Sequence, residues 1–239
     1  MGKFGDFIMI IEVVEAPYFG TNCWIFAAGK NSECFVVDPG IGANPTMVDR
    51  IRVPLERFKL KPIAVLLTHG HLDHTFSVYP LATKYEIPAL IHPLDRRLIR
   101  EPLRALTPGG ESEKLIAAFG ITEFLEPDVV QEVEDGQKIS LAGFEVTILH
   151  SPGHTKGSVM FSVDSGHLIS GDVLFAGAIG RTDLPTGSQP AMIETLCKKV
   201  LPLADELIVL PGHGPQTTIA RERKFNPYLQ ESYLNGKRL

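Results

Sequence analysis

The sequence has few cysteines and no long apolar run. Its 239 residues include three cysteines, Cys23, Cys34 and Cys197, which are widely spaced and form no CxxC motif. Such spacing is typical of free thiols in a reducing compartment. No run approaches the roughly 20 apolar residues that span a membrane, and residues 1–17 lack the apolar core and cleavage site of a signal peptide. These absences predict a cytoplasmic protein with no membrane partner.

An excess of basic residues is also missing. The 23 lysines and arginines are outnumbered by 28 aspartates and glutamates, which gives a formal net charge of −5. A protein without a broad basic surface has little attraction for the phosphates of nucleic acids, so we expect no nucleic-acid partner. We interpret the single basic run, DRRLIREPLR at 95–104, as the solvated face of a helix.

Short apolar runs bounded by turn residues alternate with stretches of helical periodicity. The runs predict strands at 7–14, 22–28, 33–38, 62–68, 88–92, 137–141, 144–150, 157–163, 167–175 and 206–211. The periodic stretches predict helices at 43–58, 74–86, 94–106, 188–204 and 217–234. We expect Pro54 to disturb the first of these helices, Pro80 to kink the second and Pro227 to interrupt the last. No linker divides the β-rich and αβα segments, which favours two mixed sheets with helices on their outer faces.

The stretch THGHLDH at 68–74 holds three of the eight histidines of the chain and one aspartate. It follows the predicted strand at 62–68. His69 and His71 alternate and therefore point the same way at a strand end, and Asp73 and His74 follow closely. Four nitrogen and oxygen ligands this close together are typical of a metal site.

Three later stretches have the same form. His154 in SPGHTKGS, Asp172 in SGDVLF and His213 in PGHGP each lie just beyond an apolar strand and beside glycine. Ligands at the same ends of neighbouring strands converge on one cleft, and glycine permits the tight turns there. The sequence therefore predicts one metal-binding cleft built from four segments.

Taken together, HxHxDH, PGHT, GDVLF and PGHGP in this order resemble the metallo-β-lactamase superfamily, over residues 21–229. The stretches GRTDLP at 180–185, PGHGPQT at 211–217 and NPYL at 226–229 are similar to those of glyoxalase II-related enzymes, the hydroxyacylglutathione hydrolases. The resemblance implies a four-layer αββα sandwich of two mixed β-sheets. It also implies a single domain over 1–239, with a short helical extension at 217–239.

The resemblance further implies a site for two divalent metal ions. Its first group of ligands would be His69, His71 and His154. Its second group would be Asp73, His74 and His213, with Asp172 as the bridging ligand. Zinc is the expected metal, and iron or manganese are the alternatives for such ligands.

Several neighbouring residues have two interpretations. His150 competes with His154 as a ligand, and we interpret it as a packed histidine or one that supports a ligand. Asp38 in VVDPG is either a turn residue or a hydrogen-bonding support for the metal loop. Thr68 and Thr155 adjoin ligands and can act in the same way.

Three further residues have simpler interpretations. We expect His92 to be a loop residue and His167 to lie in an exposed hairpin turn. Cys23 falls in a predicted strand and is expected in the core rather than as a nucleophile.

The activity that the resemblance implies is hydrolysis of a thioester. The substrate would be an S-(2-hydroxyacyl) thiol conjugate such as S-lactoylglutathione, a small-molecule partner. A metal-bound hydroxide would attack the carbonyl carbon, and Asp73 would orient that hydroxide. A thiolate leaves readily, because the pKa of a thiol is about 8.5.

The sequence departs from the glyoxalase II pattern at positions that would contact the thiol part of the substrate. Arg181 stands at the position of a lysine, and Asp183 and Pro215 stand at the positions of tyrosines. Arg181 is either a substrate-binding residue for a carboxylate or a surface arginine. The sequence ends at Leu239, so we expect it to lack the helical C-terminal domain that grips glutathione in typical members.

Two other functions remain open. A persulfide dioxygenase with a single iron would use His71, His154 and Asp172, a facial triad. A non-catalytic metal-binding member of the fold is the alternative outside the enzymes, although all seven ligands are present. A β-lactamase or a nucleic-acid-cleaving member fits less well, because no export signal and no basic surface are found.

Overall fold

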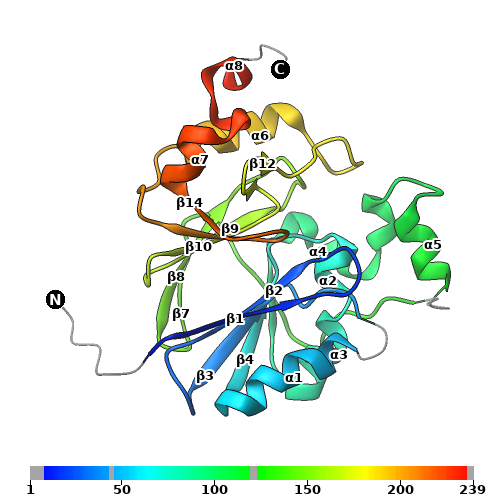
Figure 1. Cartoon of the computed structure of the whole chain (residues 1–239). Coiled ribbons are helices and arrows are strands. Elements are labelled where there is room, and N and C mark those ends of the chain that lie inside the picture. Colours follow the sequence, from blue (N-terminus) through cyan, green and yellow to red (C-terminus); the bar gives the residue numbers. More distant parts are fainter. Residues whose placement is uncertain (1–7, 43–45, 119–122, 236–239) are drawn as a thin grey trace.

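The structure, a computed structural model, describes residues 8–42, 46–118 and 123–235. Two six-stranded sheets face each other, and helices cover their outer faces (Figure 1). Within the described residues, no helix has the length and apolar character needed to cross a membrane.

The first sheet has the order β1-β2-β3-β4-β5-β6. Its strands are β1 (Ile10–Glu15), β2 (Asn22–Ala27), β3 (Glu33–Val37), β4 (Lys61–Leu66), β5 (Ala89–Ile91) and β6 (Val130–Glu132). Pairing is antiparallel from β1 to β3 and parallel from β3 to β6. The sheet is therefore mixed, as predicted.

The second sheet has the order β14-β13-β10-β9-β8-β7. Its strands are β7 (Lys138–Leu141), β8 (Phe144–His150), β9 (Val159–Val163), β10 (His167–Gly171), β13 (Ile208–Pro211) and β14 (Thr217–Thr218). Only β10 and β13 pair in parallel. Strands β11 (Leu174–Phe175) and β12 (Ala178–Ile179) form a hairpin that is a separate two-stranded sheet.

The helices fall between and after these strands. They are α1 (Met47–Phe58), α2 (Leu72–Thr75), α3 (Val78–Tyr85), α4 (Pro93–Arg100), η1 (Pro102–Ala105), α5 (Glu111–Ala118), α6 (Gln189–Thr195), η2 (Leu196–Val200), α7 (Ile219–Phe225), η3 (Pro227–Leu229) and α8 (Glu231–Leu234). The segment η2, a turn of π-helix, continues α6 directly.

Three apolar layers hold the sandwich together. Phe26, Phe35 and Phe161 are fully buried between the sheets, and the rings of Phe26 and Phe35 stack with centroids 5.1 Å apart. Ile51 of α1 packs in the layer outside the first sheet, and Met192 of α6 in the layer outside the second. These layers establish the four-layer αββα arrangement.

Prolines affect the helices differently from the prediction. Pro54 lies inside α1 without ending it. Its ring is buried on the core face of the helix, and this packing offsets the hydrogen bond that proline cannot donate. Pro80 falls in the first turn of α3, where backbone N–H groups have no helical partner anyway. The predicted helix at 74–86 is therefore two helices rather than one kinked helix.

Other predicted elements are shorter than expected. The strand predicted at 167–175 ends at Gly171 and resumes only as the hairpin strand β11. The helix predicted at 94–106 breaks before Pro102, which disfavours helical backbone at the preceding residue. The final helical segment breaks at Pro227, as predicted. Neither α5 nor β6 was predicted from the sequence.

The directions of the strands determine where the ligand-bearing turns lie. Strands β8, β10 and β13 run in one direction, because β9 is antiparallel to both β8 and β10, and β13 is parallel to β10. Their carboxyl ends therefore meet at one edge of the second sheet. Backbone bonds connect this edge to the first sheet: Val159 N–H donates to Thr68 O at 2.8 Å, and Asn22 N–H to Gly212 O at 2.7 Å.

Candidate metal centre

All seven side chains that the sequence singled out as metal ligands meet at this edge. They form three overlapping groups in which the ligand atoms lie within 4.8 Å of one another. The groups are His69, His71 and His154; His69, His74 and Asp172; and Asp73, His74 and His213.

Asp172 lies between the two histidine clusters. Its Oδ2 is 3.5 Å from both His154 Nε2 and His213 Nε2, and its Oδ1 is 3.3 Å from His74 Nε2. On one side His71 Nδ1 and His154 Nε2 are 2.7 Å apart, and on the other His74 Nε2 and His213 Nε2 are 3.2 Å apart. A carboxylate in this position can contact two ions at once.

Hydrogen bonds on the outer side of each ring fix which nitrogen faces the centre. His154 Nδ1–H donates to Arg181 O at 2.8 Å, and His213 Nδ1–H donates to Phe19 O at 3.1 Å. A carbonyl oxygen only accepts, so these contacts place the proton on Nδ1. The lone pair of Nε2 therefore points into the centre in both rings.

Asp38 orients two more histidines. Its Oδ2 accepts from His74 Nδ1–H at 2.9 Å and from Thr68 Oγ1–H at 2.6 Å, and its Oδ1 accepts from Thr68 N–H at 2.9 Å. Because Thr68 donates to Asp38, its hydroxyl oxygen accepts from His69 Nδ1–H at 3.0 Å. Asp38 and Thr68 therefore support the metal loop, the second of the two interpretations made from the sequence.

The donor set fits a metal ion. The Nε2 atom of His69 is buried and has no hydrogen-bond partner among the described residues. Such an orphaned acceptor is costly in a protein interior, and several imidazole lone pairs directed at one point repel each other unless a cation lies between them. Imidazole nitrogens with carboxylate oxygens suit zinc, iron and manganese.

Burial and the neighbouring charges shift the pKa values of these ligand side chains. Burial lowers the pKa of His71 to about 3, with the neighbouring His154 as a second cause, and it lowers the pKa of His69 well below its usual range. Burial opposes the ionised form of Asp73 and Asp172, yet His74 and the other imidazoles outweigh it and lower the pKa of both carboxyls. Neutral imidazoles and ionised carboxylates are the forms that bind metals.

His74 and His213 differ from His69 and His71, because their pKa values are raised rather than lowered. Burial opposes the charge of His74, but Asp172, Asp73 and Asp38 raise its pKa well above the usual value. The metal-free centre therefore holds a proton on His74, and an ion that binds there must displace it.

Glycine at position 212 makes the close approach of these groups possible. A Cβ atom there would lie 2.2 Å from Asp172 Oδ1 and 2.8 Å from His74 Cε1. No side chain larger than hydrogen fits without moving a ligand.

Asp95 is an important residue that the sequence did not reveal. It lies in the basic run interpreted as a solvated face, yet it is fully buried in the first turn of α4. Its Oδ2 accepts from Gly70 N–H at 2.8 Å and from Thr155 Oγ1–H at 2.6 Å, and its Oδ1 accepts from Gly157 N–H at 2.8 Å. Asp95 thereby connects the loop of His69 and His71 to the loop of His154, and only its place directly after the helix start HPL could have hinted at this.

The remaining histidines lie outside the centre. His150 Nε2–H donates to Lys156 O at 2.9 Å, and its ring stacks on His92 with ring centroids 4.1 Å apart and planes within 6°. His92 lies between β5 and α4, as expected, but it is buried and its Nδ1 caps α4 by accepting from Leu94 N–H at 3.3 Å.

His167 is not in an exposed turn, so that prediction was wrong. It is buried as the first residue of β10, with its ring edge-on to Phe26. The turn ends one residue earlier, at Gly166, whose φ of +84° suits glycine.

A cleft of about 570 Å³ opens over the centre. Besides the metal groups, its walls are largely apolar and include Phe19, Leu106, Phe175 and Leu184. Arg181 also lines the cleft, but Asp183 holds its guanidinium through two hydrogen bonds of 2.7 and 2.6 Å, and both side chains are mostly exposed.

Cys23 is buried in β2, as predicted, and burial raises the pKa of its thiol.

Comparison with known proteins defines the family. A model of the metallo-beta-lactamase superfamily matches residues 16–213. The chain belongs to the metallo-β-lactamase superfamily. The match covers all seven residues of the metal groups.

Relatives from this superfamily extend over nearly the whole chain. An uncharacterized protein of Mycobacterium tuberculosis is 42% identical over 230 residues, covering 93% of this chain and 98% of the relative. The hydroxyacylglutathione hydrolase GloC of Haemophilus influenzae is 35% identical over 223 residues, covering 92% and 98%. The crystal structure of TTHA1623 in a di-iron-bound form has 32% identity and a TM-score of 0.72, covering 91% of this chain and all of that one.

Proposed function

We propose that this protein is a hydrolase that uses two divalent metal ions to cleave a thioester of a 2-hydroxy acid, such as S-lactoylglutathione. The observation that carries the proposal is the convergence of seven ligand side chains on one cleft, with the Nδ1 protons of His74, His154 and His213 directed outward. Zinc is the proposed metal. Iron is the alternative, since a similar protein has been solved in a di-iron-bound form.

Each group has its own place in this proposal. His69, His71 and His154 would hold one ion, Asp73, His74 and His213 the other, and Asp172 both. When bound, such ions lower the pKa of a water molecule toward neutrality and stabilise the developing oxyanion. The carbonyl carbon of the substrate must therefore lie over Asp172, between the two groups.

Asp73 has the role of orienting the attacking water. Its pKa is lowered, so it is ionised at neutral pH and can only accept hydrogen bonds. Its Oδ2 already accepts from Thr21 Oγ1–H at 3.3 Å, which limits the rotation of the carboxylate. An acceptor held in this way directs a water proton away from the substrate carbonyl.

The leaving group explains why a thioester suits this cleft. A thiolate departs without protonation, because its conjugate acid has a pKa of about 8.5. Among the described residues that line the cleft, no histidine, lysine or tyrosine outside the metal groups is placed to act as a general acid. Cys23 and Cys34 cannot act as nucleophiles, since both thiols are buried and burial raises their pKa values.

The similarity to the H. influenzae hydrolase supports the acyl and thiol class. The apolar walls formed by Phe19, Leu106, Phe175 and Leu184 suit an acyl chain or thiol arm without charge close to the sulfur. Arg181 could hold a carboxylate only by sharing its guanidinium with Asp183.

A thioester panel with parallel oxygen measurement tests the proposal. The metal-loaded protein should release thiol from S-lactoylglutathione and related 2-hydroxyacyl thioesters without consuming oxygen. Asp172→Ala should abolish this release, whereas Asp128→Ala, a change at an exposed aspartate, should not. Oxygen uptake with a persulfide, and no thiol release, would instead identify a dioxygenase.

A further inference from the structure

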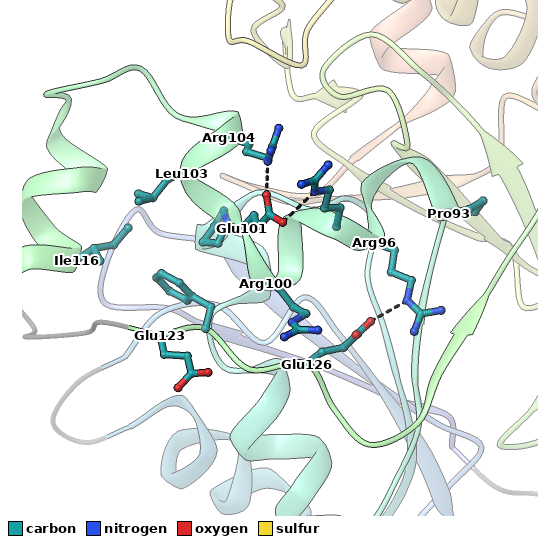
Figure 2. A pocket seen from close by; sticks show the side chains of 12 residues that line it. Pro93, Arg96, Arg100, Glu101, Leu103, Arg104, Ile116, Glu123 and Glu126 are labelled. Atoms are coloured by element: carbon teal, nitrogen blue, oxygen red, sulfur yellow. Dashed lines mark hydrogen bonds and ion pairs between the residues drawn. The ribbon is translucent and has the colours of Figure 1, made fainter.

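A second cleft, larger than the one over the metal groups, lies beside α4 and η1 (Figure 2). Its volume is about 970 Å³. Four arginines of α4 and η1 line it: Arg96, Arg97, Arg100 and Arg104. We call it the arginine cleft. None of these residues has a part in the hydrolysis proposed above.

The guanidiniums of the arginine cleft outnumber the carboxylates that hold them. Glu101 accepts from both Arg97, at 2.9 Å, and Arg104, and is thus shared between two cations. Arg96 is held by two carboxylates, Glu126 at 2.7 Å and Glu132 at 3.1 Å. Within the part of the chain that the structure describes, Arg100 has neither an ion pair nor a hydrogen bond, and Figure 2 shows its side chain extended into the cleft.

The third lining carboxylate does not restore the balance. Glu123 lies on the opposite side of the cleft in Figure 2, and no ion pair connects it to the arginines among the described residues. Arg97 and Arg104 therefore share one carboxylate, and Arg100 is paired with none among the described residues. The lining thus combines four guanidiniums with three carboxylates, on a chain whose net charge is −5.

Apolar groups complete the lining. Ile116 is buried, Phe124 packs against the same small apolar cluster, and Leu103 is half exposed. Guanidiniums next to an apolar wall suit a ligand whose apolar arm ends in an oxyanion, because the arginine fork matches phosphate and carboxylate oxygens.

Adjoining stretches of the chain line the two clefts. Leu106, Thr107 and Gly110 line the metal cleft, and Leu103 and Arg104 line the arginine cleft. Successive Cα atoms are about 3.8 Å apart, so Arg104 and Leu106 are separated by at most about 8 Å. The linings of the two clefts therefore lie next to each other at this segment.

We propose that the arginine cleft binds an oxyanion at the far end of the substrate's thiol arm while the thioester lies over the metal groups. The proposal rests on the proposed function and defines its substrate class: thioesters of a long thiol that ends in phosphate or carboxylate. Arg181 does not fill this role, because Asp183 occupies its fork.

Matched thioesters test the proposal on the metal-loaded full chain at low ionic strength. S-lactoylpantetheine and its 4′-phosphate differ by one oxyanion, as do the glycyl ethyl ester of S-lactoylglutathione and S-lactoylglutathione itself. In one of these pairs the oxyanion should raise kcat/KM about tenfold through KM, as expected for a charged hydrogen bond. The pair that shows the effect identifies phosphate or carboxylate.

The double variant Arg97→Gln/Arg100→Gln should reduce that advantage to less than about twofold. Arg52→Gln is the matched control, since Arg52 pairs with Glu56 at 2.9 Å in the same i, i+4 arrangement as Arg97 with Glu101. It should leave the tenfold advantage intact. An oxyanion without effect in both pairs, or an advantage that survives in the double variant, would overturn the proposal.

A binding measurement separates this proposal from the proposed function. Fluorescence anisotropy of dansyl-labelled 4′-phosphopantetheine and of dansyl-labelled glutathione requires no hydrolysis. If no thioester is cleaved, about tenfold weaker binding of one probe to the double variant still supports the arginine cleft. Equal binding of both probes to the wild type and the double variant would contradict it.

Discussion

At the residue scale, the centre depends on where each imidazole keeps its proton. His69, His74, His154 and His213 donate from one ring nitrogen to an oxygen, so the other nitrogen is free to bind a cation. This arrangement distinguishes ligands from nearby histidines. His150 uses its Nε2 for the Lys156 carbonyl and packs flat on His92.

The pair His150 and His154 gives a direct test of this distinction. His154→Ala should remove a ligand and lower the bound metal from two equivalents toward one per chain, with loss of activity. His150→Ala should keep both equivalents, because its ring contacts no metal group. Metal analysis of the purified variants measures the difference, and an emptied site in His150→Ala with a full one in His154→Ala would refute the assignment.

Asp95 provides a second test. Asp95→Asn keeps the size of the side chain but places an amide donor against a backbone N–H of Gly70 or Gly157. We expect a loss of about 1–3 kcal/mol in the free energy of unfolding and roughly tenfold weaker binding of one metal equivalent. Urea unfolding and chelator competition measure these changes.

Asp128→Asn, at an exposed aspartate, is the control for this test. If Asp95→Asn binds both equivalents as tightly as the control does, Asp95 does not position the histidine loops.

At the scale of elements, the ends of strands place the ligands and α4 holds their loops together. The ligands follow β4, β8, β10 and β13, and the amino-terminal turn of α4 contacts the loops after β4 and β8 through Asp95. His92 caps this helix with an unprotonated Nδ1. The protonation state of His92 therefore affects the start of α4 and, through Asp95, the two ligand loops that this helix holds together.

The pKa of His92 predicts an acid-sensitive element. Burial, with His150 as a second cause, lowers this pKa to about 4 from the usual 6.5. The unfolded chain therefore binds a proton that the folded chain excludes, and stability falls as the pH decreases from about 6.5 to 4. His92→Asn retains a capping side chain but does not titrate.

The stability of His92→Asn should fall less than that of the wild type between pH 7 and pH 5. Urea midpoints at the two pH values measure this, in metal-free protein so that ligand titration is equal in both. An identical decrease in wild type and variant would show that His92 is not an acid-sensitive element.

The sequence predicted most strands of the two sheets and the seven ligands for the same reason. Apolar runs followed by glycine and a polar ligand are local patterns, and all seven metal-group residues were found in this way. Asp95 was missed because its partners, Gly70 and Gly157, are distant in sequence and adjoin it only after folding. The effect of Pro80 was predicted wrongly, because it depends on where the helix begins, and tertiary packing sets that position.

At the scale of the whole molecule, the metal groups join the two sheets. Residues from the first sheet, at the end of β4, and from the second, after β8, β10 and β13, meet in one cluster. An ion bound there bridges both halves of the sandwich. Metal binding should therefore stabilise the entire fold rather than one loop.

Removing the metal should lower the midpoint of thermal unfolding. A ligand present at 100 to 1,000 times its Kd contributes about 3–4 kcal/mol, which corresponds to roughly 6–16 °C in a domain of this size. Calorimetry with and without chelator measures the shift. An unchanged midpoint would mean that the cluster binds no metal in the native protein.

A titration of metal-free protein with zinc, followed by thiol release from S-lactoylglutathione, tests the central claim most directly. If the seven residues hold two ions that act together on a thioester, the rate should rise to a plateau at two equivalents of zinc per chain. No thiol release at two bound equivalents, from this or any other activated thioester, would contradict the account.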